Sequence, residues 1–345
     1  MAGVVAIHCI LGLHSGLGLI ASSQFLLLLL QPFKFATIGF FLISGFLMGN
    51  KLLQSSSGEY LARRIRTIFV PWMLWFLLFC AETIARNTMH NQFNPHSAND
   101  AVFLLLHDVR RLLFTTEYWF VPNLLVALGI LLLCRRFLFD PRLGLLFAAL
   151  SIFYGMNIYT NWFAASSHTQ AFFGFIFYLW LGAWSARDRK DITSWIERFP
   201  MPTLIALVVV SALASLGEGL FLIRLGTDEP ANSLRISNQI FSVAAVLLIF
   251  RARKPLWPRM VNVRANTYGI FLIHPFAIWI LTSILRRTIL GRVSGLTGGA
   301  HMAAAFCLLL VFFAATYGCS LALTRWLLKI PRLRWTVGNF ALNRR

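Results

Sequence analysis

The stretch TLIALVVVSALASLGEGLFLI, residues Thr203–Ile223, carries one charged side chain, Glu218, in 21 residues. A helix rises about 1.5 Å per residue, so this stretch is long enough for the roughly 30 Å hydrocarbon core of a bilayer. A spanning segment of this kind has to be a helix, because lipid offers its backbone groups no hydrogen-bond partner. The stretch therefore predicts a membrane-spanning helix.

Similar apolar runs recur along the whole chain, and short clusters of charged residues separate them. Together the runs predict about ten membrane spans. The predicted spans are Met1–Ala21, Phe35–Gly49, Ile68–Ala85, the run from Tyr118 to just before Arg135, Leu143–Tyr159, Ala171–Ala186, Thr203–Ile223, Ile236–Phe250, Thr267–Leu285 and Met302–Leu328. No soluble domain fits between them, so we expect one all-α, polytopic integral-membrane domain over residues 1–345.

The composition supports a membrane protein and argues against two other classes. Hydrophobic residues make up 58% of the chain and charged residues 12%, against about 25% charged in a typical soluble domain. The net charge of +19 could indicate nucleic-acid binding, but the basic residues punctuate apolar runs, so we expect no nucleic-acid partner. The five cysteines show no CxxC spacing, so neither a disulfide framework nor a metal site is expected.

The distribution of positive charge predicts how the chain is oriented. Most of the 31 Lys and Arg residues lie in one set of alternate loops. The positive-inside rule makes that set cytoplasmic, and both termini belong to it. The long polar stretch around His90, His96 and His107 is then expected on the outside. The N-terminus itself contributes nothing to this bias, because the first basic residue is Lys34.

Two histidines lie inside predicted spans, where a titratable side chain is costly and is a functional hypothesis by default. His8 lies about 10 Å along the first helix, and His274 follows the start of its span at Thr267 by the same spacing. Both spans begin on the cytoplasmic side, so the two imidazoles are expected at similar depth. Each ring could instead be structural: His8 bonded to a neighbouring carbonyl, and His274 in the polar notch that Pro275 opens.

Three arginines, Arg63, Arg64 and Arg66, precede the third span and are called the arginine cluster below. Arg63 and Arg66 share a helical face at a spacing of three residues. Guanidinium groups bind phosphates through paired hydrogen bonds, so the cluster could hold the phosphates of a cofactor. The alternative is plain anchoring by positive charge at the cytoplasmic surface.

Three further features predict helix packing rather than chemistry. Ser44-Gly45 and the pair Gly12 and Gly16 place small residues inside apolar helices, which permits close helix contact. Ser44 does not resemble a hydrolase nucleophile, since a leucine stands where GxSxG needs its first glycine. The segment Glu117-Tyr-Trp-Phe-Val-Pro122 predicts aromatic residues that anchor a helix at the outer membrane interface.

Five motifs, taken in their order and spacing, resemble the acyltransferase 3 family of bacterial inner-membrane proteins. The motifs are Val4-Val-Ala-Ile-His8, Phe40-Phe-Leu-Ile-Ser-Gly-Phe46, Tyr60-Leu-Ala-Arg-Arg-Ile-Arg66 with Pro71, Tyr118-Trp-Phe-Val121 and Thr267-Tyr-Gly-Ile-Phe-Leu-Ile-His-Pro275. The resemblance covers nearly the whole chain. It implies a ten-helix enzyme of the bacterial inner membrane that takes an acyl group, usually acetyl, from cytoplasmic acyl-coenzyme A. The acceptor is implied to be an extracytoplasmic hydroxyl, often of a surface glycan.

The resemblance also implies roles for individual residues. His8 would be the central catalytic group, either as a general base or as a transient acceptor of the acyl group. His274 and Tyr268 would orient it or relay protons, and the arginine cluster would hold the phosphates of coenzyme A. The expected donor is acetyl-CoA or another acyl-CoA, with no metal. The expected partners are membrane lipid and a glycan or lipid-linked sugar that is O-acetylated.

Family members usually carry an arginine about three helical turns before the first-span histidine, and that position would lie upstream of Met1. No basic residue precedes Lys34 either. Both observations predict that translation begins earlier than Met1. The alternative is a genuine short form that is inserted by its later, strongly charged loops.

Two functions of other classes remain as alternatives. A transporter or flippase for a lipid-linked sugar would also cross the membrane many times, although mid-membrane carboxylates are scarce and no inverted repeat of broken helices is visible. A non-catalytic partner of a polysaccharide synthase is the second alternative. Such an inactive relative would be expected to lack the first-span histidine, and His8 is present.

Overall fold

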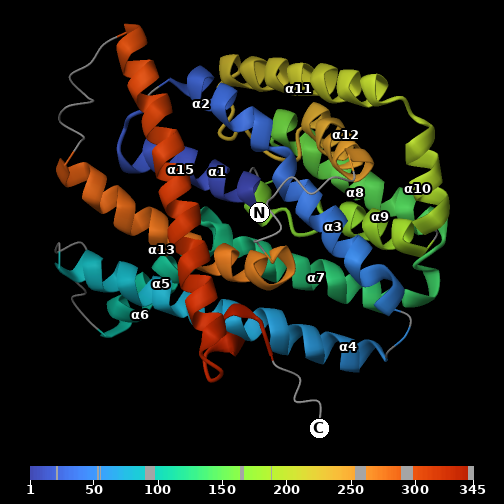
Figure 1. The fold of residues 1–345 in the computed structure, drawn as a ribbon, viewed down its shortest axis with the longest axis horizontal. Coiled ribbons are helices and arrows are strands. Elements are labelled where there is room, and N and C mark those ends of the chain that lie inside the picture. Colours follow the sequence, from blue (N-terminus) through green and yellow to red (C-terminus); the bar gives the residue numbers. More distant parts are fainter. Residues whose placement is uncertain are drawn as a thin grey trace.

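The computed structural model describes the chain except residues 21, 53, 55, 90–97, 164–166, 188, 253–261, 289–297 and 341–345. Within the described part the regular elements are all helices, which confirms the all-α prediction (Figure 1). His90 and His96, from the stretch predicted to lie outside, fall beyond the described residues. His107 is placed, on an exposed position of a helix.

The helices follow one another through short turns. In chain order they are α1 (Ala2–Leu11), η1 (Gly12–Gly16), α2 (Ser23–Leu30), η2 (Gln31–Phe33), α3 (Phe35–Leu52), α4 (Ser57–Arg64), η3 (Ile65–Phe69), α5 (Val70–Met89), α6 (Ala98–Thr115), η4 (Glu117–Trp119), α7 (Phe120–Leu133), η5 (Arg135–Phe137), α8 (Pro141–Thr160), η6 (His168–Gln170), α9 (Ile176–Arg187), α10 (Arg189–Arg198), α11 (Met201–Arg224), α12 (Ile236–Ala252), α13 (Val263–Thr288), α15 (Gly298–Lys329) and η7 (Arg334–Val337). The elements η1 and η3 are π-helical turns, and the other η elements are 3-10 turns.

Six helical stretches are long and apolar enough to cross a membrane, or seven if one bent pair counts as a single span. Two shorter apolar helices, Ala2–Gly16 and Ile236–Ala252, join them. The predicted count of about ten is therefore not confirmed in the described chain. One reason is that apolar runs do not always form one straight helix. The bent pair, Asn99–Thr115 and Glu117–Leu133, turns by 81° around Thr116, whose side chain caps the new turn.

Two spans extend further than the sequence pattern indicated. The elements α2, η2 and α3 form one continuous stretch, Ser23–Leu52, so Lys34 lies within it and not in a loop before the span. The elements α4, η3 and α5 form a second continuous stretch, Ser57–Met89. The arginine cluster is therefore carried on a helix that continues into the third span.

Glycines bring α3 and α9 into direct backbone contact, as the small residues around Ser44 predicted. A Cβ atom placed on Gly45 would collide with the carbonyl oxygen of Leu179, and one placed on Gly182 with the carbonyl oxygen of Leu42. The two helices can approach this closely only because neither has a side chain at the crossing. The contact holds α3, which lines the site described below, against the core of the bundle.

Glycines also bring the first helix against α13. A Cβ atom on Gly12 would lie 3.1 Å from Cγ2 of Ile278, and one on Gly16 would lie 2.9 Å from Cγ2 of Thr282. The prediction that Gly12 and Gly16 permit close helix contact is therefore confirmed. This contact sets α1 beside α13 in the middle of the bundle, which Figure 1 shows behind α15.

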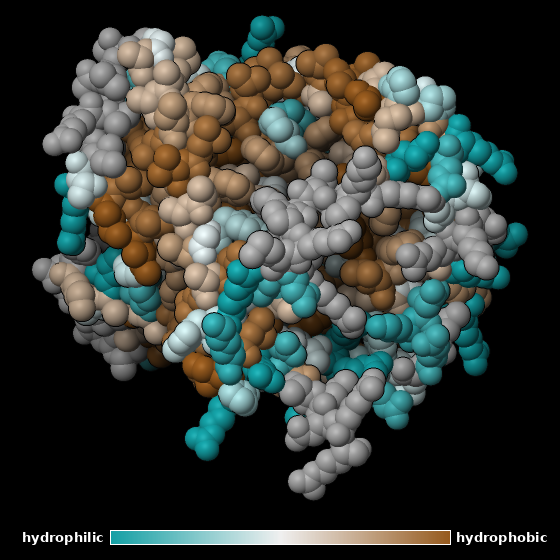
Figure 2. Space-filling model, viewed as in Figure 1, coloured by the Kyte–Doolittle hydropathy of each residue, from teal (hydrophilic) through white to brown (hydrophobic). Residues whose placement is uncertain are grey.

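The outer surface matches a protein surrounded by lipid. Large apolar side chains are exposed along α11 and α15, where Val210 and Val311 are each 65% exposed. Figure 2 shows hydrophobic side chains over the part of the molecule where α11 and α15 lie, and hydrophilic ones gathered toward α4 and α10. An exposed apolar band with polar residues at one end is the surface expected of a membrane helix bundle.

Candidate active site

The two histidines predicted at similar depth are in direct contact. Nε2 of His274 on α13 lies 3.1 Å from Nδ1 of His8 on α1, and the ring centroids are 5.1 Å apart. His274 is fully buried, and His8 is partly buried. The close approach of α1 and α13 at Gly12 and Gly16 makes this contact possible. The similar depth thus reflects a shared site.

The second nitrogen of His274 is bonded to the backbone of its own helix. Nδ1 lies 2.8 Å from the carbonyl oxygen of Phe271 and 3.1 Å from that of Ile270. Pro275 has no N–H, so the helix bond that would occupy the carbonyl of Phe271 is not made. The structural interpretation of His274, a ring in the notch opened by Pro275, is therefore correct in its geometry. The same bond directs Nε2 toward His8, so the two interpretations are compatible.

The hydrogen-bond partners assign the protons in the neutral pair. A carbonyl oxygen only accepts, so Nδ1 of His274 donates and carries the proton. Nε2 of His274 is then an acceptor, and Nδ1 of His8 donates to it. This leaves Nε2 of His8 without a proton and with its lone pair available. A neutral imidazole with a free, fixed nitrogen can act as a base or as a nucleophile.

A third group, Glu117, faces that free nitrogen. Its Oε2 lies 3.8 Å from Nε2 of His8, its side chain is buried, and its Oε1 has no hydrogen-bond partner among the described residues. The η4 turn that carries it is held from two sides. Tyr118 donates its hydroxyl to the carbonyl of Leu272 at 3.1 Å, and Trp72 donates its indole N–H to the carbonyl of Tyr118 at 3.0 Å.

The prediction of an aromatic anchor for this segment is wrong. Tyr118 and Trp119 are 0% and 6% exposed and pack inside the bundle, not at the lipid interface. Sequence reasoning missed Glu117 because the aromatic residues after it resemble an interface motif. The available signal was the carboxylate itself, which directly precedes a motif that carries the family resemblance.

The side chains of His8, Glu117 and His274 are also of the types that bind metal ions, and one ligand atom from each lies within 4.8 Å of the others. Their shortest contacts favour a different arrangement. His8 directs Nδ1 to His274 and Nε2 to Glu117. The three side chains therefore form a row of contacts, from His274 through His8 to Glu117. This row of contacts is suited to proton transfer.

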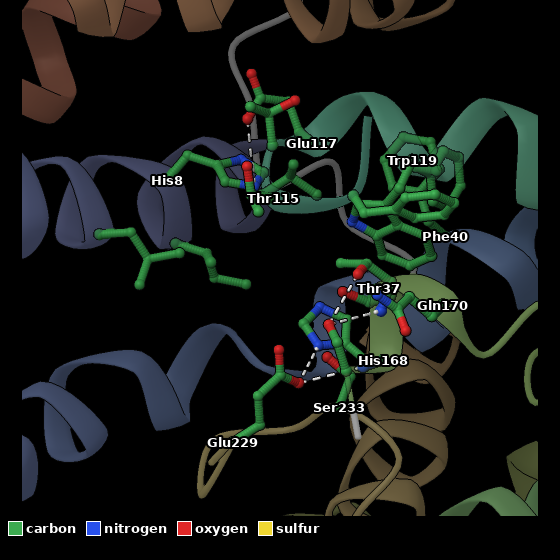
Figure 3. A pocket seen from close by; sticks show the side chains of 18 of the residues that line it. His8, Thr37, Phe40, Thr115, Glu117, Trp119, His168, Gln170, Glu229 and Ser233 are labelled. Atoms are coloured by element: carbon green, nitrogen blue, oxygen red, sulfur yellow. Dashed lines mark hydrogen bonds and ion pairs between the residues drawn. The ribbon is translucent and has the colours of Figure 1, made fainter. Parts of the chain in front are cut away.

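His8 and Glu117, at one end of this row of contacts, line a cavity of about 400 Å³. Figure 3 shows His8, Thr115 and Glu117 at one end and His168, Glu229 and Ser233 at the other. Aromatic side chains form part of the wall, among them Phe40, Trp119 and Phe120. The lining residues come from α1, α3, α6, η4, α7, η6, α13 and the turn between α11 and α12, so distant parts of the chain build one polar pocket with an apolar wall.

The far end of the cavity is organised by His168 and Glu229. Oε2 of Glu229 accepts from the backbone N–H of His168 at 3.1 Å, from the Asn232 amide at 3.0 Å, and lies 3.0 Å from Nδ1 of His168. Burial opposes ionisation of this carboxyl, but the charge of His168 and its hydrogen bonds outweigh it, and the pKa of Glu229 falls to about 2. Glu229 is therefore a carboxylate already engaged by its neighbours.

Three helices, α7, α9 and α12, start near the cavity and have arginines at or just after their other ends. The helix α9 starts at Ile176, after η6, and ends at Arg187. The helix α12 starts after the turn with Glu229 and has Arg251 in its last turn. The helix α7 starts beside Glu117, and Arg135 follows its end. Each of these three helices therefore runs from the cavity toward an arginine at or just after its other end.

The remaining predicted residues lie outside this cavity. The guanidinium of Arg64 donates to the hydroxyl of Tyr60 through Nε at 3.1 Å and Nη2 at 2.9 Å, whereas Arg63 and Arg66 are exposed. Tyr268 donates its hydroxyl to the backbone carbonyl of Ile68, in the π-helical turn next to the arginine cluster. Tyr268 thus contacts the arginine-bearing segment, while His274, on the same helix, contacts His8.

Comparison with known proteins gives one match. The family described as an acyltransferase domain matches residues 1–325 of the chain. No curated protein and no solved structure matches it significantly. The matched range contains every residue of the site described above.

Proposed function

We propose, because the chain belongs to the acyltransferase 3 family over residues 1–325, that it transfers an acyl group across a membrane. The donor is cytoplasmic acyl-CoA, most simply acetyl-CoA, and the acceptor is a hydroxyl of an extracytoplasmic glycan or lipid-linked sugar. The membrane is the inner membrane of a bacterium. One observation carries the chemistry: the His8 ring lies between His274 and Glu117 at the edge of a cavity, with Nδ1 bonded to His274 and the lone pair of Nε2 facing Glu117.

His8 can promote the transfer in either of two ways. As a general base, its Nε2 takes the proton of the acceptor hydroxyl while the hydroxyl oxygen attacks the thioester carbon; coenzyme A leaves as a thiolate and then receives that proton. As a nucleophile, Nε2 bonds to the thioester carbon, the C–S bond breaks and coenzyme A leaves as a thiolate. The acceptor hydroxyl oxygen then attacks the acyl carbon, the C–N bond to His8 breaks, and Glu117 takes the hydroxyl proton. The second route moves the acyl group past His8 while coenzyme A stays on its own side.

The neighbours of His8 support both routes. His274 fixes the proton of His8 on Nδ1 and shares the positive charge that develops on the imidazole. Glu117 lies close enough to stabilise that charge or to receive the acceptor proton. The arrangement resembles the orienting and charge-stabilising partners that other nucleophile–base pairs use.

The arrangement of charges supports an inward-facing donor site and an outward-facing acceptor site. The arginine cluster lies on a surface that carries hydrophilic side chains in Figure 2, near α4. Arg63 and Arg66 are exposed there and would bind the phosphates of coenzyme A. The cavity lies at the N-terminal ends of α7, α9 and α12, and arginines lie at or just after their C-terminal ends. The positive-inside rule then puts the arginines in the cytoplasm and the cavity outside.

The same orientation gives about ten crossings with both termini cytoplasmic, when the short helices α1, α7, α9 and α12 are counted with the long ones. Reporter fusions test this directly. A reporter after Gly49 should be active in the cytoplasm, and one in the loop around His96 should be active outside. A cytoplasmic His96 loop would contradict the orientation.

Release of free thiol from acetyl-CoA by the purified protein in lipid nanodiscs tests the function. We expect thiol release that depends on His8 and increases with a hydroxyl acceptor. His107→Ala is the matched control, because His107 is an exposed histidine on α6, away from the cavity. A transporter or flippase for a lipid-linked sugar would release no thiol, and neither would a non-catalytic partner of a synthase.

A further inference from the structure

Lys34 is a buried cation that the proposed chemistry does not use. It is 6% exposed and lines the cavity. Within the described residues its ammonium makes no ion pair and no hydrogen bond. A buried ammonium is unfavourable unless an anion or several acceptors compensate it. Lys34 therefore faces the cavity in need of a partner.

The carboxylates around the cavity are engaged elsewhere. Glu229 interacts electrostatically with Lys34, but its Oε2 accepts from His168 and Asn232. Glu117 faces His8. The buried Arg235, which also interacts with Lys34, is bonded to neutral acceptors: the carbonyl of Asn232, both oxygens of Ser215 and the amide oxygen of Gln31. Among the described residues, no carboxylate at this end of the cavity forms an ion pair with Lys34.

A second polar group at the same end also lacks a partner. Ser233 is 1% exposed and lines the cavity, and its hydroxyl oxygen makes no hydrogen bond in the described part of the chain. Buried hydroxyls are normally hydrogen-bonded. Lys34, in the continuous stretch Ser23–Leu52, and Ser233, in the turn before α12, can both donate a hydrogen bond, and both lack a partner among the described residues. Together they indicate a bound group with acceptor oxygens.

We propose, on the basis of the acyltransferase function above, that this end of the cavity binds an anionic group of the acceptor. Lys34 forms the ion pair, and Ser233 donates a hydrogen bond to the same carboxylate or phosphate oxygens. The hydroxyl to be acylated lies at the other end, beside His8. The acceptor is then an acidic sugar or a phosphate-linked sugar, and a neutral glycan is a poorer substrate.

The dimensions and the wall of the cavity agree with one sugar unit held between the two ends. A volume of about 400 Å³ lies within the range of pockets that take small molecules. Lys34 and His8 line the same cavity and interact electrostatically, so one ligand can contact both. Phe40 and Trp119 provide an apolar face against which the C–H side of a sugar ring can pack.

The test compares acceptors of different charge with the full-length protein in nanodiscs. The probes are p-nitrophenyl glucuronide for a carboxylate, glucose 6-phosphate for a phosphate, and p-nitrophenyl glucoside as the neutral match of the first. We measure kcat/KM for acetylation by mass spectrometry. The wild type should favour an anionic probe by about 10- to 100-fold, the range of a hydrogen-bonded charge. The preferred anion separates the two sources.

Three variants locate the effect. Lys34→Met should abolish the preference for the anionic probe, mainly through KM, and Lys34→Arg should restore much of it because the charge is kept. Lys51→Met is the matched control, since Lys51 is exposed at the far end of the same helix. It should keep both the preference and the rate. Equal use of the neutral and anionic probes by the wild type would overturn the proposal, as would a preference unchanged in Lys34→Met.

A binding measurement separates this proposal from the proposed function. Affinity for p-nitrophenyl glucuronide, followed by calorimetry without acetyl-CoA, should fall in Lys34→Met and recover in Lys34→Arg. If no thiol is released from acetyl-CoA but this binding behaves as expected, the anion site stands and the acyltransferase assignment fails. If thiol is released and the glucuronide, the phosphate and the glucoside bind equally, the anion site fails and the acyltransferase assignment stands.

Discussion

Nε2 of His274 lies 3.1 Å from Nδ1 of His8, although 266 positions separate the two residues in the chain. The contact joins the first helix to one of the last and places an imidazole pair in the interior of the bundle. Because Nδ1 of His274 is bonded to Phe271, the pair has a direction: it leaves the free lone pair on Nε2 of His8.

Removal of the His8 imidazole should stop the chemistry. In His8→Ala we expect thiol release from acetyl-CoA to fall by at least about 100-fold, the usual contribution of a positioned base. Membrane abundance should stay near normal, because His8 is only partly buried. Mass spectrometry of wild type incubated with acetyl-CoA alone distinguishes the two routes: an added acetyl group on His8 identifies the nucleophile. Near-normal turnover in His8→Ala would remove this residue from the mechanism.

Replacement of His274 should act through the acceptor that it presents to His8. In His274→Ala we expect kcat to fall by about 10- to 100-fold, with little change in the KM for acetyl-CoA. His274→Gln should recover part of the loss, since a glutamine amide oxygen can accept a hydrogen bond near the position of Nε2. Equal kcat in the Ala and Gln variants would show that the hydrogen bond to His8 has no catalytic role.

Glu117 should matter for its charge and not for its volume. Glu117→Gln keeps the shape of the side chain but removes a base, so we expect kcat to fall by about tenfold or more while the protein still folds. Glu117→Asp, which keeps the charge on a shorter side chain, should be less impaired. Both are compared by thiol release at saturating acetyl-CoA. A fully active Glu117→Gln would mean that Glu117 only fills space beside His8.

The arginine cluster should contribute to donor affinity. In the double variant Arg63→Gln with Arg66→Gln we expect the KM for acetyl-CoA to rise by about tenfold or more, because each charge-assisted phosphate contact is a strong polar interaction. Arg136→Gln with Arg142→Gln is the matched control, since both of those arginines are exposed and flank the start of α8. Unchanged KM in the first pair would return the cluster to membrane anchoring.

The pair His168–Glu229 should make stability depend on pH. The pKa of Glu229 is lowered to about 2, so its stabilising contribution is present above the ordinary glutamate pKa of about 4.3 and is lost as pH falls toward 2. Glu229→Gln should therefore lower the melting temperature at pH 7, by roughly 2–4 °C. The difference from wild type should shrink as pH falls from about 5 to 3. A difference that stays constant over that range would contradict the assignment.

The sequence was informative where chemistry and helix position coincide. His8 and His274 could be assigned to one depth, because a helix has a fixed rise and both spans start on the same side. Gly12, Gly16 and Gly45 could be assigned to helix contacts, because small residues in apolar helices have few other uses. These predictions depend only on local geometry.

The parts that sequence reasoning missed depend on how helices break. Thr116 starts a new turn at 81° to the helix before it, and this bend carries Glu117 inward to His8. A hydropathy profile does not show such a bend, so the sequence of the segment after it predicts an anchor at the membrane interface. The position of Lys34 was missed for a related reason. Its charge made the predicted span start after it, at Phe35, whereas the helix continues through it from Ser23 to Leu52.

The ring of Pro275 has a consequence for how this site can change over generations. Its missing N–H leaves the carbonyl of Phe271 available to His274, and that bond decides which nitrogen of each imidazole holds a proton. A substitution that restored an N–H at position 275 would compete for the same carbonyl and alter the tautomer of both rings. Acid–base behaviour could thus drift in a descendant whose histidines and glutamate are all intact.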